Sequence, residues 1–480
     1  MKELFLAREV DPGKFGSQPD TMVWQSWTDT YSIPWPRVQE IQLEALQTRF
    51  GQMVEKIPVL ATLAEEQGVK KIERIEDGAP LLFPHSFYKS YPLSFIEKAR
   101  YDRLTQWLDN LTVHDLSLVN TDGIDTIDAW VALLDRDTPV RLIHTTGTSG
   151  KFSFFPRSLL DYPSVMRNWR LGFEGFGGEP DAKPVEGLET IPVIGTGYRK
   201  GAVGICRMLD AFVDHMFDGD ESMVISLNPG RLSVDILSLG ARILAAEAKG
   251  ESGLLQIPPE LMARRDKFIE EQKSAPERTK VFFASMAERF AGQRVIALGS
   301  WLQLFDMAEG GRANGLDHVF SSDTLVWTAG GTKGRKLPAD YKVQTAAFYG
   351  VPKIYEAYGM SEINVMMPLC PHGHYHVAPW TIAYVLEPRT GVPFPRTGKQ
   401  TGRLGLIDLV TESRWGGVLS GDNVTLHWGE DRPCRCGRIG PYLEDNVRRL
   451  SEMEGGDDKV ACAGAPEAVD KALSFLSELE

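Results

Sequence analysis

A short stretch of the sequence, TTGTSGK from Thr145 to Lys151, concentrates hydroxyl groups and ends in a lysine. The backbone N–H groups of a glycine-rich loop after a strand can point at an anion, and the hydroxyls and the lysine add donors. A Walker A loop requires glycine where Thr145 stands and serine or threonine where Phe152 stands, so this is not an ordinary P-loop. Alone, the stretch predicts either an anion-binding loop or a plain polar turn.

Four further motifs follow along the chain, each weak by itself. Ala329-Gly-Gly-Thr332 follows a β-prone run and allows a ligand to approach the backbone closely. Tyr355-Glu-Ala-Tyr-Gly-Met-Ser-Glu362 supplies a ring for stacking and a carboxylate for a divalent cation. Ser420-Gly-Asp422 offers a carboxylate that can accept hydrogen bonds from two ribose hydroxyls, and Cys436-Gly-Arg438 completes the series.

Thiols and imidazoles gather in two short stretches, CPHGHYH from Cys370 to His376 and CRC from Cys434 to Cys436. They hold three of the five cysteines and three of the nine histidines. Thiolate and imidazole are the natural ligands of tetrahedral zinc. The alternative is ordinary buried thiols with surface histidines.

Some single residues have two interpretations. His144 directly precedes the hydroxyl-rich loop, where it would approach a phosphate or acyl group or simply bond to backbone at a strand end. Trp24, Trp27 and Trp35 are interpreted as packing residues. Cys462 lies late in the chain without a local motif.

Alternating strand and helix signals predict the element order around these motifs. Residues 140–144, 192–195, 223–226, 294–298, 324–328 and 353–358 are β-prone, and helical spacing is found over 38–57, 115–134 and 232–248. The glycine-rich segment 196–204 is expected to be a loop facing a substrate pocket. This order predicts a mostly parallel sheet covered by helices.

From Tyr375 the pattern changes to shorter strands over 375–386, 402–410 and 418–427, which predict an antiparallel or barrel-like subdomain. The predicted organisation has four parts: an N-terminal helical region of the large domain over 1–137, an α/β core with the loop over 138–370, a β-rich subdomain over 371–452, and a hinge-like remnant with one terminal helix over 453–480.

Composition limits the classes of function. The chain has 480 residues, a net charge of −13 and no basic block, so nucleic acid is not an expected partner. No stretch approaches 18 uninterrupted apolar residues, and the beginning lacks the pattern of a signal peptide. With few cysteines, the sequence predicts a cytoplasmic protein without disulfides or a membrane span.

The five motifs occur in the order TTGTSGK, AGGT, YGMSE, SGD and CGR, which resembles the adenylate-forming superfamily of acyl-CoA synthetases, adenylation domains and luciferases. CRCGR looks most like the phenylacetate-CoA ligase branch, with acyl-protein synthetases nearby. The resemblance covers residues 143 to 459 and implies an α/β fold with a small β-rich subdomain.

The resemblance also implies roles for individual residues. The loop, Thr145, Thr146, Gly147, Thr148, Ser149, Gly150 and Lys151, would clasp the β- and γ-phosphates of ATP, with His144 nearby. Gly330 and Gly331 would line the adenine slot, and Tyr358 would stack on the adenine. The neighbouring Thr332, Gly359 and Ser361 would also belong to the cofactor-binding residues. Glu362 would bind Mg²⁺, and Asp422 and Arg438 would bind the ribose. The branch pattern selects Cys370, His376, Cys434 and Cys436 as ligands of a structural Zn²⁺.

The implied reaction is activation of a small carboxylic acid to acyl-AMP, followed by transfer to CoA. Transfer to a protein thiol through Cys462, or an accessory protein that binds acyl-AMP with little turnover, are the alternatives. Two departures bear on this choice. Phe152 stands where the family loop has proline, and only about 20 residues follow the hinge-like EGGDDKV, so Lys471 matches no family lysine. The expected substrate pocket is walled by residues 196–206, 299–304 and 331–336.

Overall fold

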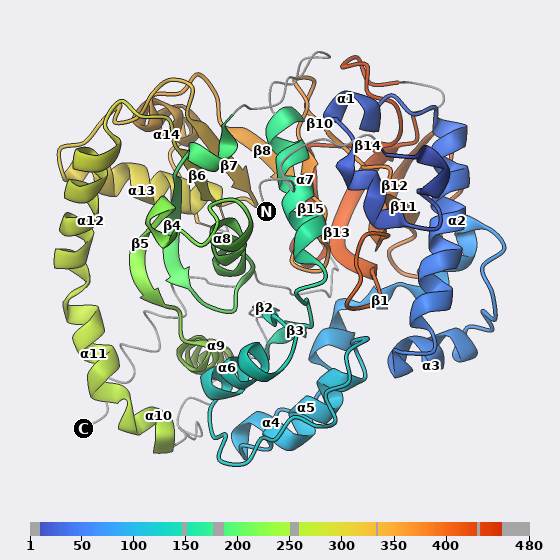
Figure 1. Ribbon diagram of the computed structural model, residues 1–480, viewed down its shortest axis with the longest axis horizontal. Coiled ribbons are helices and arrows are strands. Elements are labelled where there is room, and N and C mark those ends of the chain that lie inside the picture. The colour runs from blue at the N-terminus through green and yellow to red at the C-terminus, as the bar shows by residue number, and fades with distance from the viewer. Residues whose placement is uncertain are drawn as a thin grey trace.

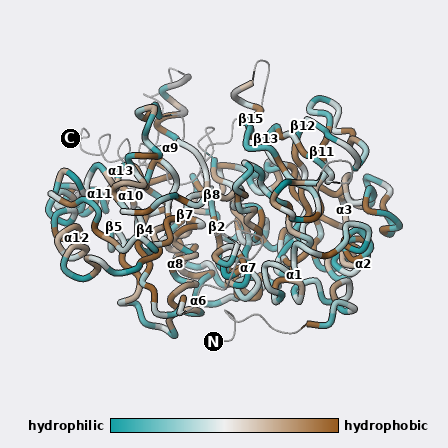
Figure 2. The backbone as a smooth tube through the Cα atoms, turned by 90° about the horizontal axis from the view of Figure 1, so that it is seen from above, coloured by the Kyte–Doolittle hydropathy of each residue, from teal (hydrophilic) through white to brown (hydrophobic). Residues whose placement is uncertain are grey.

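The computed structural model describes residues 10–145, 151–175, 187–249, 259–332, 335–429 and 433–453. Two β-sheet regions lie side by side, one flanked by helices α12, α13 and α14 and the other by α2 and α3 (Figure 1, Figure 2). The helices are α1 Trp27–Thr30, α2 Trp35–Met53, α3 Pro58–Glu66, α4 Ser94–Glu97, α5 Tyr101–Asp109, α6 Ile127–Asp137, α7 Tyr162–Gly175, α8 Gly204–His215, α9 Val234–Lys249, α10 Pro259–Ala263, α11 Arg265–Lys273, α12 Ala275–Phe290, α13 Trp301–Ala313 and α14 Tyr341–Tyr349.

The strands are β1 Phe83–Pro84, β2 Ile143–Thr145, β3 Ser153–Phe155, β4 Val193–Lys200, β5 Val224–Arg231, β6 Ile296–Gly299, β7 Leu325–Ala329, β8 Tyr355–Tyr358, β9 Met367–Pro368, β10 His374–His376, β11 Thr381–Leu386, β12 Lys399–Asp408, β13 Gly417–His427, β14 Tyr442–Glu444 and β15 Arg448–Arg449. None of the helices in these described ranges has the length and apolar content needed to cross a bilayer.

The first sheet has the order β5-β4-β6-β7-β8-β9, with every pair parallel except the β8–β9 edge. Because successive side chains alternate between faces, Val193 packs on the side of α7 and α8, while Ile194 packs on the side of α12, α13 and α14. Helices on both faces bury the central strand β6 and most of β7, whereas the end of β5 is exposed. The predicted α/β fold with a mostly parallel sheet is therefore confirmed.

The second sheet is antiparallel along β10-β14-β13-β12-β11. Strand β1, from the N-terminal region, adds to β13 in parallel, and Phe83 lies opposite Val418. The N-terminal helix α2 packs into the same apolar core as this sheet, and the Gln42 side chain donates to the carbonyls of Pro379 and Thr381. The predicted β-rich subdomain is present, as an open sheet covered by N-terminal helices.

Three sequence-based expectations about elements were wrong. Residues 375–386 form two strands, β10 and β11, which lie at opposite ends of the path β10-β14-β13-β12-β11. Residues 115–134 do not form one helix, because side-chain oxygens of Asp115 and Asn120 cap turns at Ser117 and Asp122, and helix α6 begins only after Thr126. The segment 196–204 is not wholly a loop, since β4 continues to Lys200 by pairing with β5.

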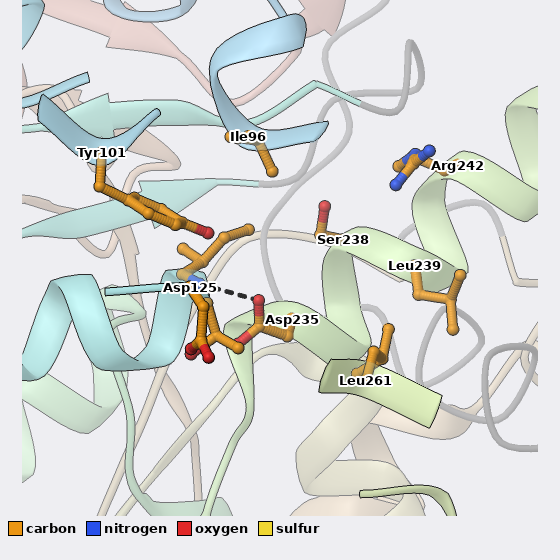
Figure 3. A pocket seen from close by; sticks show the side chains of 10 residues that line it. Ile96, Tyr101, Asp125, Asp235, Ser238, Leu239, Arg242 and Leu261 are labelled. Atoms are coloured by element: carbon orange, nitrogen blue, oxygen red, sulfur yellow. Dashed lines mark hydrogen bonds between the residues drawn. The ribbon is translucent and has the colours of Figure 1, made fainter. Parts of the chain in front are cut away.

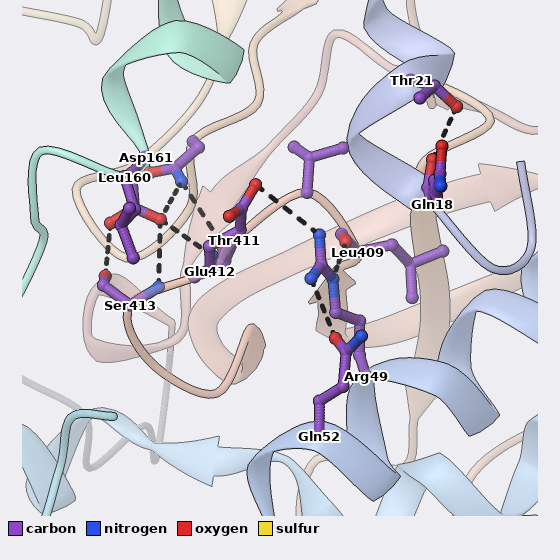
Figure 4. A network of polar contacts seen from close by, with 12 residues as sticks. Gln18, Thr21, Arg49, Gln52, Leu160, Asp161, Leu409, Thr411, Glu412 and Ser413 are labelled. Atoms are coloured by element: carbon purple, nitrogen blue, oxygen red, sulfur yellow. Dashed lines mark hydrogen bonds and ion pairs between the residues drawn. The ribbon is translucent and has the colours of Figure 1, made fainter. Parts of the chain in front are cut away.

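A buried polar network joins the segment before α7 to the loop between β12 and β13 (Figure 4). Asp161, just before α7, is fully buried and accepts hydrogen bonds from the backbone N–H groups of Ser158 and Glu412, both at 2.9 Å. It also accepts from the N–H of Ser413 at 3.3 Å and from the hydroxyl of the same residue. Arg49 of α2 reaches the same loop and donates to the Leu409 carbonyl at 2.8 Å.

Candidate functional site

The predicted nucleotide motifs lie at one edge of the parallel sheet. Strand β7 ends at Ala329, directly before Gly330 and Gly331, and β8 ends at Tyr358, directly before Gly359 and four residues before Glu362. Because neighbouring parallel strands place their carboxyl ends at the same edge, these segments are brought together there, as ligand-binding segments are in open α/β sheets. The sequence-based grouping of these two motifs is consistent with the fold.

Glycine is required at the first of these turns. Gly330 has φ +85°, a conformation that side-chain-bearing residues rarely adopt. A Cβ added at Gly330 or at Gly331 would meet no described atom within 4 Å, so the backbone here is open to a flat ligand. Whether this is the adenine slot stays a prediction.

A hydrogen bond joins two motifs that are 64 residues apart. The Tyr358 hydroxyl donates to the Asp422 carboxylate at 2.7 Å, where the β-rich sheet meets the end of β8. Burial, and then the charge of Asp422, raises the pKa of Tyr358 well above its ordinary range, so the hydroxyl remains a donor. The bond fixes the carboxylate of Asp422, a residue that is only 5% exposed.

Arg449 is a site residue that the sequence reasoning missed. Strand β15 pairs with β13 so that Arg449 lies opposite Asp422, and their side chains form an ion pair at 3.2 Å. The sequence carried only the paired arginines Arg448 and Arg449 as a signal, without a motif that separates one from the other.

Arg438, which was expected beside Asp422, lies against the N-terminal segment. Its guanidinium lies over the Trp27 ring at 4.7 Å and near the Tyr31 ring at 5.8 Å, and 7% of the residue is exposed. Its two terminal nitrogens have no hydrogen-bond partner among the described residues. The structure thus pairs Asp422 with Arg449, and a ribose contact by Arg438 stays a prediction.

Glu362 lies in this same electrostatic environment. Burial raises the pKa of its carboxyl, while the charges of Arg449 and Arg414 lower it and that of Asp422 raises it. The Arg414 side chain donates to the Glu362 backbone carbonyl at 2.6 Å, which fixes the turn after β8. A partly desolvated carboxylate is suited to a divalent cation, because the cation offsets the cost of burying the charge.

The hydroxyl-rich loop is only partly within the described residues. Thr146, Gly147, Thr148, Ser149 and Gly150 lie outside them, as do Cys462 and Lys471. The flanking residues form a two-stranded hairpin, β2 with β3, in which Thr145 pairs with Ser153.

Two chemically suggestive residues are found at this hairpin: His144 lies in β2, and Lys151 lies just before β3. Lys151 places its ammonium 4.6 Å from the centre of the Tyr91 ring, and burial lowers the pKa of this lysine. His144 is fully buried and stacks on Phe152 with ring centres 4.8 Å apart. Burial lowers the pKa of His144 to about 3, so the ring is neutral. Its two nitrogens have no partner among the described residues, and its predicted role stays a prediction.

The four predicted zinc ligands form one buried cluster. Cys370, His376, Cys434 and Cys436 have their ligand atoms within 4.8 Å of one another. The Sγ atoms of Cys370 and Cys434 are 3.8 Å apart, and Nε2 of His376 is 3.2 Å from Sγ of Cys436. Zinc–sulfur bonds of about 2.3 Å at tetrahedral angles place two sulfurs roughly 3.8 Å apart, which matches the observed spacing.

The protonation of two of these four side chains, His376 and Cys370, suits a metal ligand. Burial lowers the pKa of His376 to about 4, so the imidazole is neutral, as a ligand must be. Hydrogen bonding with Cys434 lowers the pKa of Cys370, so one thiolate is favoured. Hydrogen bonding with Cys370 raises the pKa of Cys434 and of Cys436, so these two thiols would have to give up their protons when a metal binds. His374, two residues before His376 and therefore on the same face of β10, places Nδ1 3.2 Å from Sγ of Cys434. The spacing of His374 and His376 in the sequence already indicated that both side chains would lie on one face of a strand.

Comparison with known proteins gives similarity to solved structures only. No family model and no curated protein matches the chain. The chain is similar to an open conformation of 2-hydroxyisobutyryl-CoA ligase in complex with 2-HIB-AMP and CoA, with 14% identity, coverage of 88% of this chain and 72% of that chain, and a TM-score of 0.48.

The same ligase with 2-HIB-AMP and CoA in the thioesterification state gives 15% identity, coverage of 93% of this chain and 74% of that chain, and a TM-score of 0.47. ATP-bound MatB from Rhodopseudomonas palustris gives 14% identity, coverage of 63% of this chain and 46% of that chain, and a TM-score of 0.31.

Proposed function

We propose that this protein is a member of the adenylate-forming superfamily that uses ATP to activate a carboxylic acid to acyl-AMP and transfers the acyl group to CoA. The observation that carries the proposal is the hydrogen bond from Tyr358 to Asp422, with Glu362 in the same charged environment. This bond joins an aromatic ring to the carboxylate proposed for the ribose, and the charge of that carboxylate acts on Glu362, which is proposed for the cation. The order of the motifs in the sequence predicts that these three side chains bind a nucleotide.

In the proposed first step, an oxygen of the acid attacks the α-phosphate of ATP, and the bond between the α- and β-phosphates breaks to release pyrophosphate. Tyr358 would stack on the adenine, and Asp422, held by Tyr358 and Arg449, would accept from the ribose hydroxyls. Glu362 would hold Mg²⁺ against the phosphates, and the loop ending at Lys151 would clasp them. Positioning and neutralisation of charge supply the catalysis in such reactions. A thiol then attacks the acyl carbon and releases AMP.

We further propose that Cys370, His376, Cys434 and Cys436 bind one Zn²⁺ with a structural role. Four protein ligands leave no open position for substrate. The metal would tie the strand β10 to the segment before β14, and so steady the part of the β-rich sheet that follows the nucleotide motifs.

Pyrophosphate exchange with a panel of aliphatic and aromatic acids tests the proposed activity. Exchange of labelled pyrophosphate into ATP with at least one acid is expected, and CoA should then yield the acyl-CoA. Exchange followed by acylation of the protein in place of CoA would support the acyl-protein alternative through Cys462. ATP binding without exchange for any acid would overturn the enzyme proposal and favour an accessory protein.

A further inference from the structure

The strand ends that carry the nucleotide motifs also carry an unassigned side chain, Gln303. It lies in the first turn of α13, directly after β6, and β6 lies between β4 and β7 in the parallel sheet. The carboxyl ends of β4, β6, β7 and β8 therefore surround the same edge, where ligands of open α/β sheets bind.

A capping box holds one end of the Gln303 amide. Oε1 of Gln303 accepts from the backbone N–H and from the hydroxyl of Ser300, both at 3.0 Å, and the N–H of Gln303 bonds back to that hydroxyl. Because a backbone N–H can only donate, these contacts identify the oxygen of the amide and leave Nε2 on the other side. The cap uses the oxygen of this side chain and leaves its two N–H donors for another partner.

The nitrogen end of the Gln303 amide lies beside Gly197 of β4. Among the described residues, and apart from its chain neighbours, a Cβ added at Gly197 would have only Nε2 of Gln303 within 4 Å, at 3.6 Å. At Gly204, where α8 begins, the only such neighbour is Oγ of Ser361, at 3.9 Å. Neither Gly330 nor Gly331 has any described neighbour at that distance. These four glycines thus leave space at this edge of the sheet. The described atoms closest to the first two positions are hydrogen-bonding atoms, the Gln303 amide nitrogen and the Ser361 hydroxyl oxygen.

We propose that Gln303 is a specificity-determining residue, whose Nε2 donates a hydrogen bond to an oxygen on the acid substrate other than the carboxylate being activated. The inference rests on the proposed function. Glycines leave room for the acid, and a fixed amide presents two neutral donors to it. The class of substrate is therefore an oxygen-substituted acid, such as a hydroxy or keto acid, in preference to an unsubstituted hydrocarbon acid. A site built to donate a hydrogen bond leaves its donors unpaired when the analogue lacks the acceptor.

Two substitutions separate this role from the helix cap. Gln303→Glu keeps an oxygen for the Ser300 contacts and replaces the donors by an acceptor, whereas Gln303→Leu removes both the cap and the donors. Gln106→Glu, on the exposed face of α5, is the matched control, because Gln106 also uses Oε1 to accept, from Arg103 at 3.1 Å. Thermal unfolding of each variant reports whether the cap survives.

The experiment compares pyrophosphate exchange with butyrate and its 2-, 3- and 4-hydroxy derivatives, and with benzoate and its hydroxy derivatives. The unmodified protein should prefer one hydroxy acid to its parent, and Gln303→Glu should reduce that ratio of kcat/KM at least about fivefold, as expected for the loss of one hydrogen bond. Gln106→Glu should keep the ratio. Preference for the unsubstituted parents, or an unchanged ratio in Gln303→Glu, would overturn this inference and leave the proposed function standing.

Saturation-transfer NMR with the same acids gives a readout that does not depend on turnover. Acid-selective binding that is lost in Gln303→Glu, without exchange for any acid, would support the role of Gln303 and overturn the proposed function. If the unmodified protein shows no exchange and no acid-selective binding, both the role of Gln303 and the proposed function are overturned.

Discussion

Asp128 and Asp235 each cap the helix that carries the other. The Asp235 carboxylate accepts from the N–H groups of Ile127 and Asp128 at the start of α6, both at 2.9 Å. The Asp128 carboxylate accepts from the N–H of Val234 at the start of α9, at 2.8 Å. Arg264 contacts both carboxylates, at 3.2 and 3.5 Å. Figure 3 shows Asp235 beside a cavity of about 30 Å³ at this junction.

This pair predicts a dependence of stability on pH. Burial, and then the charge of Asp128, raises the pKa of Asp235 to about 7, whereas an unfolded aspartate titrates near 3.9. The folded state therefore holds this proton more tightly than the unfolded state does. The stabilisation that protonated Asp235 contributes to the folded state is complete below about pH 4 and is lost as the pH rises through about 7. Between about pH 5 and pH 8, the melting temperature of Asp235→Asn should fall less steeply with rising pH than that of the unmodified protein.

Asp125→Asn is the control for this series, because Asp125 lines the same cavity and is exposed. It removes the same charge without removing a cap, and its melting curves should keep the original slope with pH. Equal slopes in Asp235→Asn and the unmodified protein would contradict the prediction.

The contact between Tyr358 and Asp422 predicts a graded loss of ATP binding. Tyr358→Phe keeps the ring and removes the hydroxyl that holds Asp422, so ATP affinity should fall about three- to tenfold, the size of one lost hydrogen bond. Asp422→Ala should cost more, about ten- to a hundredfold, because a charged acceptor is removed. Calorimetric titration with Mg·ATP measures both. Tyr375→Phe, with its ring centre 6.0 Å from that of Tyr358, should bind normally, and a loss equal to that of Tyr358→Phe would count against the assignment.

The cysteine and histidine cluster predicts bound zinc. Protein purified without a histidine tag should contain about one equivalent of zinc by mass spectrometry, and Cys434→Ser should reduce it to less than about a tenth. Cys206→Ser is the control, since Cys206 is a buried thiol outside the cluster that contacts the Tyr198 carbonyl. Zinc below a tenth of an equivalent in the unmodified protein would rule out the site.

The polar network at Asp161 predicts a large effect on stability. Asp161→Asn replaces one acceptor oxygen by an amide that faces donors, so the free energy of unfolding should fall by about 2–4 kcal/mol. Urea unfolding measures this change. Asp323→Asn, on the exposed segment before β7, should change stability by less than about 0.5 kcal/mol. A similar value for both variants would show that the network contributes little.

The sequence pattern was a good guide to the parallel sheet, and physical reasons explain why. Strands buried on both faces are short apolar runs, and residues 296–299 and 325–329 are nearly continuous in apolar character. Thiols and imidazoles stand out in two short stretches of the sequence, and the resemblance to the phenylacetate-CoA ligase branch selected Cys370, His376, Cys434 and Cys436 from them. The fold brings these four into one cluster, although 64 residues separate Cys370 from Cys434.

Contacts between distant segments were not readable from the sequence. The position of Arg449 opposite Asp422 depends on the register of β15 on β13, which no local pattern specifies. The packing of Arg438 on Trp27 depends on where the N-terminal segment docks. The turns between Asp115 and Thr126 were mistaken for helix, because their apolar spacing outweighed the capping signals of short polar side chains.

The pairing of β1 with β13 has a consequence for synthesis of the chain. Close to this pair, Trp415 donates to the carbonyl of Leu81 across 334 residues of sequence. At about 5–20 residues per second, a ribosome needs roughly 17–70 seconds to make that intervening stretch. During this time the apolar faces of α2 and β1 have no sheet to cover them. Transiently exposed apolar surface promotes aggregation, so a chain truncated before residue 415 is expected to aggregate more readily than the whole protein.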